Sequence, residues 1–180
     1  FNKVFEVYKD YNIISSNQIK GRGLLYLFTG DQGDRQYYKK SIDQIKQINF
    51  KFYELIDRVV IHFMQLLKID RETINKKMQL TFLKYFDDKG IWLHIDNVAR
   101  YDEGPIISIG IGPDYSYFDL TPSLAYMKNN KLKPIRLKIK EGDILMMDGI
   151  SRMEWAHGLP YNVPKKKIKY SMVFKFDKFN

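Results

Sequence analysis

The sequence predicts one α+β domain in which helices come first and a double-layered β structure, a sandwich or jelly roll, follows. Between residues 41 and 68 apolar residues recur every three or four positions, as on one face of a helix. After residue 77 the pattern changes to short alternating segments separated by Gly, Pro and Asp turns. A chain of 180 residues can bury one sizeable core, so a single domain is expected.

The composition limits the chemistry that the chain can perform. There is no cysteine, so any metal must be held by His, Asp or Glu, and a thiol nucleophile is excluded. Thirty Lys and Arg against 21 Asp and Glu give a net charge of +9, which favours a polyanionic partner such as nucleic acid. A lysine run such as that at residues 165–169 is equally typical of a solvated face. The apolar runs are too short to span a membrane, and we expect a soluble intracellular protein of the cytoplasm or nucleus.

The first 40 residues are expected to form a strand and an exposed loop. Gly23–Gly30 is an apolar run between glycines, and Asp31–Asp34 is rich in turn residues. Aromatic residues cluster around this loop, where they could stack on a base at the mouth of a site, although such residues more often belong to the core or its rim. They are Tyr26, Phe28, Tyr37 and Tyr38.

A continuous apolar stripe from Ile42 to Leu67 predicts one supporting helix, or two joined near Asn49, packed on a sheet. His62 lies beside this stripe with no carboxylate three or four residues later, and we interpret it as structural. Asp70 follows at a break and is a possible N-cap for a short turn.

Short strands separated by turns are expected through the rest of the chain, with no helix-length pattern between them. They are predicted at residues 80–85, 91–96, 107–111, 115–120, 134–140, 143–147, 152–155 and 168–176.

A candidate metal site is present in the segment Ile91–Asp96. In an extended strand residues i and i+2 share a face, so His94 and Asp96 would lie side by side. His157 is the histidine that could complete the set. Two imidazoles and one carboxylate are the ligands of a facial triad, which suits non-haem Fe(II) and leaves positions for a chelating co-substrate and oxygen. A His-x-Asp pair is common by chance, so this pair alone is weak support.

The last strand carries a second sign of a buried site. Period two places Tyr170, Met172, Phe174 and Phe176 on an apolar face and Lys169, Ser171, Val173 and Lys175 on the other. Two ammonium groups and a hydroxyl are unexpected on a buried face. Their long stems could lean towards a small dianion such as a dicarboxylate.

These residues together resemble the AlkB family of Fe(II)/2-oxoglutarate-dependent dioxygenases. The residues of these motifs are most similar to those of the eukaryotic homologues that include the tRNA-modifying type. The N-terminal third of the chain resembles the family only loosely. The motifs that carry the resemblance are Tyr85, His94-Ile-Asp96, Pro105–Gly112, Gly142–Met147, Ser151-Arg152, His157-Gly158 and Lys169–Lys175.

The resemblance implies a double-stranded β-helix (jelly roll) core at residues 78–180, with an N-terminal extension at 1–77 that supplies a substrate lid and helices. It implies that His94, Asp96 and His157 bind Fe(II) and that Tyr85, Lys169, Ser171 and Lys175 bind 2-oxoglutarate. Independently of the resemblance, the aromatic residues near the first loop, Tyr26, Tyr37 and Tyr38, are expected to contact the substrate, together with Arg152. Lys169 and Lys175 replace two arginines of the family pattern, so they keep the charge but lose the bidentate fork. Leu83 and Val98 replace a family asparagine and an acidic residue that reads the base in bacterial members.

The function implied by the resemblance is oxidative demethylation or hydroxylation of a nucleic-acid base, using O2. RNA is slightly preferred over DNA, and a single-stranded or loop substrate is favoured because a base must leave the stack to reach a buried iron. The alternatives are a turnover-deficient AlkB-like module that binds RNA or protein, motivated by the two lysines and Leu83, and an oxygenase of the same fold that acts on protein.

Overall fold

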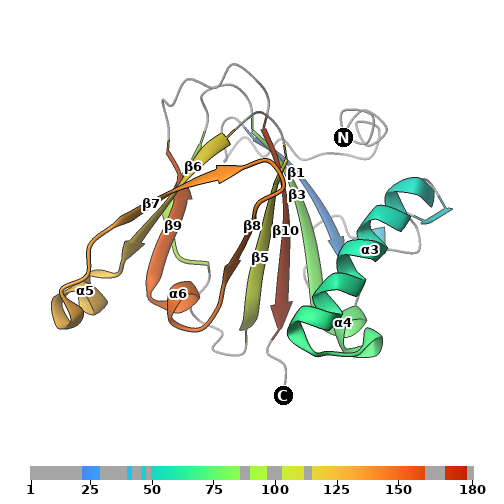
Figure 1. Ribbon diagram of the computed structural model, residues 1–180, viewed down its shortest axis with the longest axis horizontal. Coiled ribbons are helices and arrows are strands. Elements are labelled where there is room, and N and C mark those ends of the chain that lie inside the picture. Colours follow the sequence, from blue (N-terminus) through green and yellow to red (C-terminus); the bar gives the residue numbers. More distant parts are fainter. Residues whose placement is uncertain are drawn as a thin grey trace.

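Two β-sheets face each other and form the body of the protein (Figure 1). The computed structural model describes residues 22–28, 40–41, 46–47, 50–85, 90–96, 103–111, 115–160 and 169–177. Within these residues the larger sheet has six strands in the order β2-β1-β3-β10-β5-β8 and the smaller has four in the order β4-β9-β6-β7. The larger sheet contains β1 (Arg22–Phe28), β2 (Lys40–Ser41), β3 (Met78–Tyr85), β5 (Glu103–Ile111), β8 (Ile144–Met147) and β10 (Lys169–Asp177). The smaller contains β4 (Ile91–His94), β6 (Tyr115–Pro122), β7 (Ile135–Lys140) and β9 (Trp155–Leu159).

The path of the chain is that of a jelly roll. From β3 to β10 successive strands alternate between the two sheets, except for the hairpin of β6 and β7 within the smaller sheet. All described pairings are antiparallel except that of β1 with β2. The predicted jelly roll is therefore confirmed, and the strand expected at residues 23–30 is β1, at one side of β3.

Helix α3 (Phe50–Leu67) and the following α4 (Arg71–Lys77) cover the face of the larger sheet that points away from the smaller one (Figure 1). The buried side of α3 consists of residues three or four positions apart: Phe52, Ile56, Val60 and Phe63. Phe63 is fully buried and packs edge-on against Phe174 of β10, with ring centroids 4.8 Å apart. The part of the apolar stripe from Phe50 to Leu67 thus forms a supporting helix, as its spacing predicts, whereas residues 42–45 and 48–49 lie outside the described residues.

Strands β3 and β10 separate two cores because successive side chains point to opposite faces. Leu80, Phe82, Met172 and Phe174 pack towards α3. Leu83 and Tyr85 lie on the other face with Leu159 of the smaller sheet, and Val173 packs against them. This second, smaller core lies between the sheets.

Two short helices interrupt the β region, contrary to the expectation of strands alone. Helix α5 (Leu124–Asn130) is capped by the Ser123 hydroxyl, which accepts a hydrogen bond from the Tyr126 backbone amide at 3.2 Å. Helix α6 (Ile150–Met153) is a single turn after Gly149, whose φ of +49° favours glycine. The strand predicted at residues 152–155 is wrong, because this segment contains the end of α6 and the first residue of β9. Neither helix is long enough to show apolar periodicity.

Several other predicted features involve residues of which only some are described in the structure. His62 is exposed on α3. The aromatic residues Tyr37 and Tyr38, the loop at 31–34 and most of the turn at 87–90 lie outside the described residues, as do the side chains of β1. No helix in the described ranges is both long and apolar enough to cross a membrane.

The Asp70 cap gives a prediction for stability. Its carboxylate accepts a hydrogen bond from the Thr73 backbone amide at 2.7 Å and satisfies the first turn of α4, as the sequence predicts. Asp70→Ala should cost about 1 kcal/mol and lower Tm by about 2–4 °C, whereas Asp70→Ser should retain most of the stability. Thermal denaturation of the two variants checks this; equal losses would contradict a capping role.

Candidate metal centre

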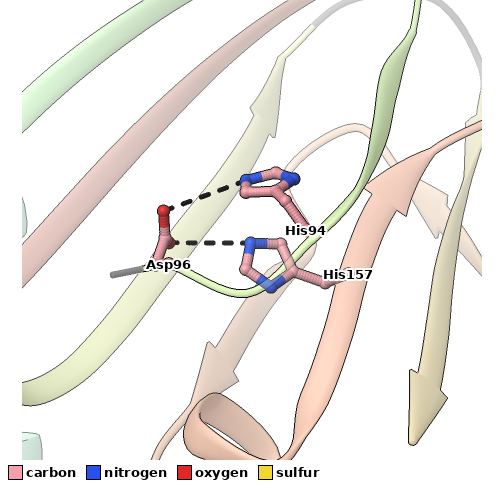
Figure 2. Close-up of side chains that lie close together, drawn as sticks. All are labelled: His94, Asp96 and His157. Carbon is pink, nitrogen blue, oxygen red and sulfur yellow. Dashed lines mark ion pairs between the residues drawn. The ribbon is translucent and has the colours of Figure 1, made fainter. Parts of the chain in front are cut away.

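Three side chains with metal-binding atoms converge between the two sheets. His94 is the last residue of β4, Asp96 lies two positions beyond it, and His157 is in the middle of β9 opposite His94. Their ligand atoms all lie within 4.8 Å of one another. Figure 2 shows both rings directed towards Asp96, with His94 Nε2 3.8 Å from Oδ1 and His157 Nε2 3.6 Å from Oδ2.

A β-bulge in β4 turns His94 inward. Ile91 pairs with Leu159 and His94 pairs with His157, so three steps along β4 match two along β9. Ile91 packs in the core between the sheets and His94 joins the metal group, while Trp92 and Leu93 are exposed. Bulges occur next to functional sites because they re-aim a side chain. The sequence predicts His94 beside Asp96, as observed, but it predicts a strand as far as Asp96, whereas β4 ends at His94, and it does not reveal the bulge.

Gly158 allows β4 to approach β9 at this bulge. A Cβ atom at position 158 would lie 2.6 Å from the Ile91 carbonyl oxygen and 3.0 Å from the Leu93 amide nitrogen. Contacts this short would force the two backbones apart. A glycine directly after His157 is the sequence signal that could have indicated close strand approach.

Local contacts set the orientation of the two imidazoles. His94 Nδ1 lies 2.8 Å from the Trp92 carbonyl oxygen, which can only accept a hydrogen bond. We therefore assign the proton to Nδ1, which leaves the lone pair of Nε2 towards Asp96. The His157 ring stacks on Phe118, with centroids 5.8 Å apart and planes at 12°. Its Nδ1 has no hydrogen-bond partner among the described residues.

The ionisation states of His157 and Asp96 suit metal binding at neutral pH. Burial lowers the pKa of His157 to about 4, against the opposing attraction of Asp96. Burial acts to raise the pKa of Asp96, but its ion pair with Lys175 and the nearby histidines outweigh this, and the pKa lies below the usual value. Metal ligation needs a neutral imidazole and a charged carboxylate, and these are the forms that the surroundings favour.

Lys175 contacts the carboxylate of this group directly. Its Nζ lies 2.7 Å from Asp96 Oδ1, with the two side chains 30% and 18% exposed. The sequence assigns Lys175 to the co-substrate, and that role stays a prediction; in the structure its ammonium contacts the candidate metal ligand.

Arg152 is also in the interior rather than on an open surface. It is only 2% exposed; burial lowers the pKa of its guanidinium, while the attraction of Asp96 and Asp177 raises it. Two cations, Lys175 and Arg152, are thus balanced by two carboxylates, Asp96 and Asp177. The expected contact of Arg152 with a substrate stays a prediction.

The other residues assigned to the co-substrate lie nearby along β3 and β10. Tyr85 is 2% exposed, and the backbone register pairs it with Lys169. Ser171 is buried, and its hydroxyl is 2.9 Å from that of Ser108 on β5. The side chains of Lys169 and Tyr26, and all of Val98, lie outside the described residues, so their predicted roles remain untested.

The donor set fits a divalent metal ion. Bonds of about 2.1 Å at right angles place neighbouring ligand atoms about 3 Å apart. The observed 3.6 and 3.8 Å separations therefore need to shorten by less than about 1 Å, and the whole group, which lies within 4.8 Å, by less than about 2 Å. Two nitrogen ligands and one carboxylate are the facial set typical of non-haem Fe(II).

The chain is similar to proteins of known structure. No protein-family model and no curated protein matches the sequence. An oxidoreductase of the 2OG-Fe(II) oxygenase family from Burkholderia pseudomallei is 14% identical, with a TM-score of 0.44 over 57% of this chain. This chain spans 44% of that protein's length.

A prolyl-4-hydroxylase from Pseudomonas putida is similar over more of its length. It is 13% identical, with a TM-score of 0.53 over 99% of this chain and 84% of its own. At this identity the similarity establishes architecture alone. The chain is therefore a jelly-roll domain that shares the fold of this prolyl-4-hydroxylase.

Proposed function

We propose that this chain is an Fe(II)- and 2-oxoglutarate-dependent dioxygenase. The observation that carries the proposal is the convergence of His94, Asp96 and His157 between the two sheets of a jelly roll. Fe(II) with 2-oxoglutarate and O2 would supply the oxidation of a C–H bond, with release of succinate and carbon dioxide. The protein's own contribution is to hold, orient and shield the reacting groups.

Each residue of the site has a role in this proposal. His94 and His157 would bind the metal through Nε2 and Asp96 through its carboxylate. The Trp92 carbonyl keeps the proton of His94 on Nδ1, away from the metal. The apolar group formed by Leu83, Tyr85, Leu159 and Phe118 lies beside His157 and would exclude water from that side.

The charges of the site support a dicarboxylate co-substrate. The charges of two cations, Lys175 and Arg152, and two carboxylates, Asp96 and Asp177, cancel. A divalent ion would therefore add two positive charges that a dianion neutralises. Tyr85, Ser171 and Lys169 are the groups that we assign to it. Because Lys175 contacts Asp96, Lys169 is the lysine that we place at the distal carboxylate.

For the substrate we propose a nucleic-acid base, with single-stranded or loop RNA slightly preferred over DNA. Support comes from the net charge of +9 and from the sequence motifs that resemble the AlkB family. The reaction would be demethylation of an N-methyl group or hydroxylation of a carbon. Tyr26, Tyr37, Tyr38 and Arg152 are the residues we assign to substrate binding.

The test is a substrate screen with the intact chain, Fe(II), 2-oxoglutarate and air. Single-stranded RNA and DNA carrying N-methylated bases, and proline-containing peptides, are each analysed by mass spectrometry for loss of a methyl group or gain of oxygen. We expect RNA to change fastest, with Asp96→Ala inactive on every substrate. Modification of peptides alone would favour the protein-directed alternative. Metal and 2-oxoglutarate binding without any turnover would favour the binding module.

A further inference from the structure

We propose that Lys175 is a positioning residue that acts through Asp96 as a counter-cation. Its ammonium holds Asp96 in place in the metal-free protein and competes with a bound metal ion for the same carboxylate. This inference rests on the proposed metal site and adds a property of it, namely that the protein tunes its metal affinity with an internal positive charge.

The geometry of the ion pair carries the inference. Lys175 Nζ lies 2.7 Å from Asp96 Oδ1, a distance typical of a strong charge-assisted hydrogen bond. The other oxygen, Oδ2, faces His157 Nε2 at 3.6 Å. One oxygen is therefore engaged by the ammonium, while the other remains directed to the metal position.

The location of Lys175 makes this contact firm. It lies on β10, between β3 and β5, and its neighbours Phe174 and Phe176 are buried against α3. Asp96 lies beyond the end of β4 in the other sheet. The ion pair thus connects the two sheets at the site and restrains the segment that carries Asp96.

The energetic consequence follows from burial. Asp96 is 18% exposed, so its charge is poorly hydrated and depends on a positive partner. A divalent ion would supply that partner itself, and it would then be repelled by the ammonium that is already present. Removing the charge of Lys175 should therefore lower the stability of the protein without metal and raise its affinity for the metal ion.

This result separates the inference from a purely structural role. If Lys175 were needed only to orient the Asp96 carboxylate, its loss would lower the affinity for the metal ion. If it acts as a competing charge, its loss raises that affinity. Thermodynamic linkage requires that a larger metal-induced rise in Tm accompanies the tighter binding.

The experiment uses Mn²⁺ as the probe and four variants of the full chain: K175M, K175Q, K175R and the control K133M, whose lysine is exposed before β7. Free Mn²⁺ is measured by electron paramagnetic resonance, and Tm is recorded with and without the ion. We expect K175M and K175Q to have a lower metal-free Tm, a larger rise in Tm on adding Mn²⁺, and a Kd about tenfold lower. K175R and K133M should match the original protein.

Each other outcome has a definite meaning. Equal or weaker Mn²⁺ binding in K175Q and K175M, with intact folding shown by circular dichroism, would overturn the counter-cation role and leave the metal site in place. If K175M does not fold, K175Q decides, because glutamine can still donate a hydrogen bond to Asp96. Absence of Mn²⁺ binding in the original protein and all variants would overturn the proposed metal site itself.

Discussion

Asp96→Ala is expected to weaken divalent-metal binding by at least about 100-fold, because even the loss of an outer partner of a ligand costs about 10–100-fold. Asp96 is the sole anionic member of the group of three ligand candidates, and its oxygens face both imidazoles. Its removal also leaves Lys175 without this carboxylate, so a lower Tm is expected as well. Mn²⁺ titration followed by electron paramagnetic resonance measures the affinity directly.

Asp119→Ala is the matched control for this variant. Asp119 lies on β6 in the same sheet, and its carboxylate forms a two-pronged pair with Arg136 at 2.6 and 2.7 Å, away from the ligand group. This control should bind Mn²⁺ like the original protein. Near-normal binding by Asp96→Ala would remove Asp96 from the site, and a loss in both variants would point to general damage of the sheet.

Gly158→Ala is expected to disturb both stability and metal binding. The added methyl would press on the Ile91 carbonyl and the Leu93 amide across the bulge, and overpacking of this kind costs about 1–3 kcal/mol. A chain of this size would lose about 2–4 °C in Tm for each kcal/mol. Because relief of the clash moves β4 away from β9, His94 is displaced from His157, and metal affinity should fall by at least about tenfold.

Gly110→Ala tests whether this effect is specific to position 158. A Cβ at Gly110 on β5 would meet its nearest neighbours at 3.5 and 3.6 Å, which are ordinary contacts. We expect this variant to keep its metal affinity. If Gly158→Ala behaves the same way, the close approach of β4 and β9 does not position His94.

The parts of the fold that follow from local periodicity were predictable from the sequence. The stripe of α3 and the alternation of β10 each place one kind of side chain on one face, and Asp70 caps α4 through a contact three residues away. His94 and Asp96 are likewise only two residues apart, so their closeness was predictable from local spacing, although β4 ends at His94 and Asp96 lies beyond it.

Features that depend on contacts between distant segments were not predictable in this way. The bulge at Trp92 and Leu93 arises from the pairing of β4 with β9. Helix α6 is a single turn, which is too short to show a helical pattern of apolar residues in the sequence. The contact of Lys175 with Asp96 joins two sheets through a flexible side chain, which period two cannot direct to one partner.

An anaerobic titration with Fe(II) and 2-oxoglutarate tests the central claim most directly. We expect a visible charge-transfer band that requires both components and is absent in Asp96→Ala, followed by formation of succinate when air is admitted. A folded protein that gives neither the band nor succinate would contradict the claim that His94, Asp96 and His157 hold an iron that oxidises 2-oxoglutarate.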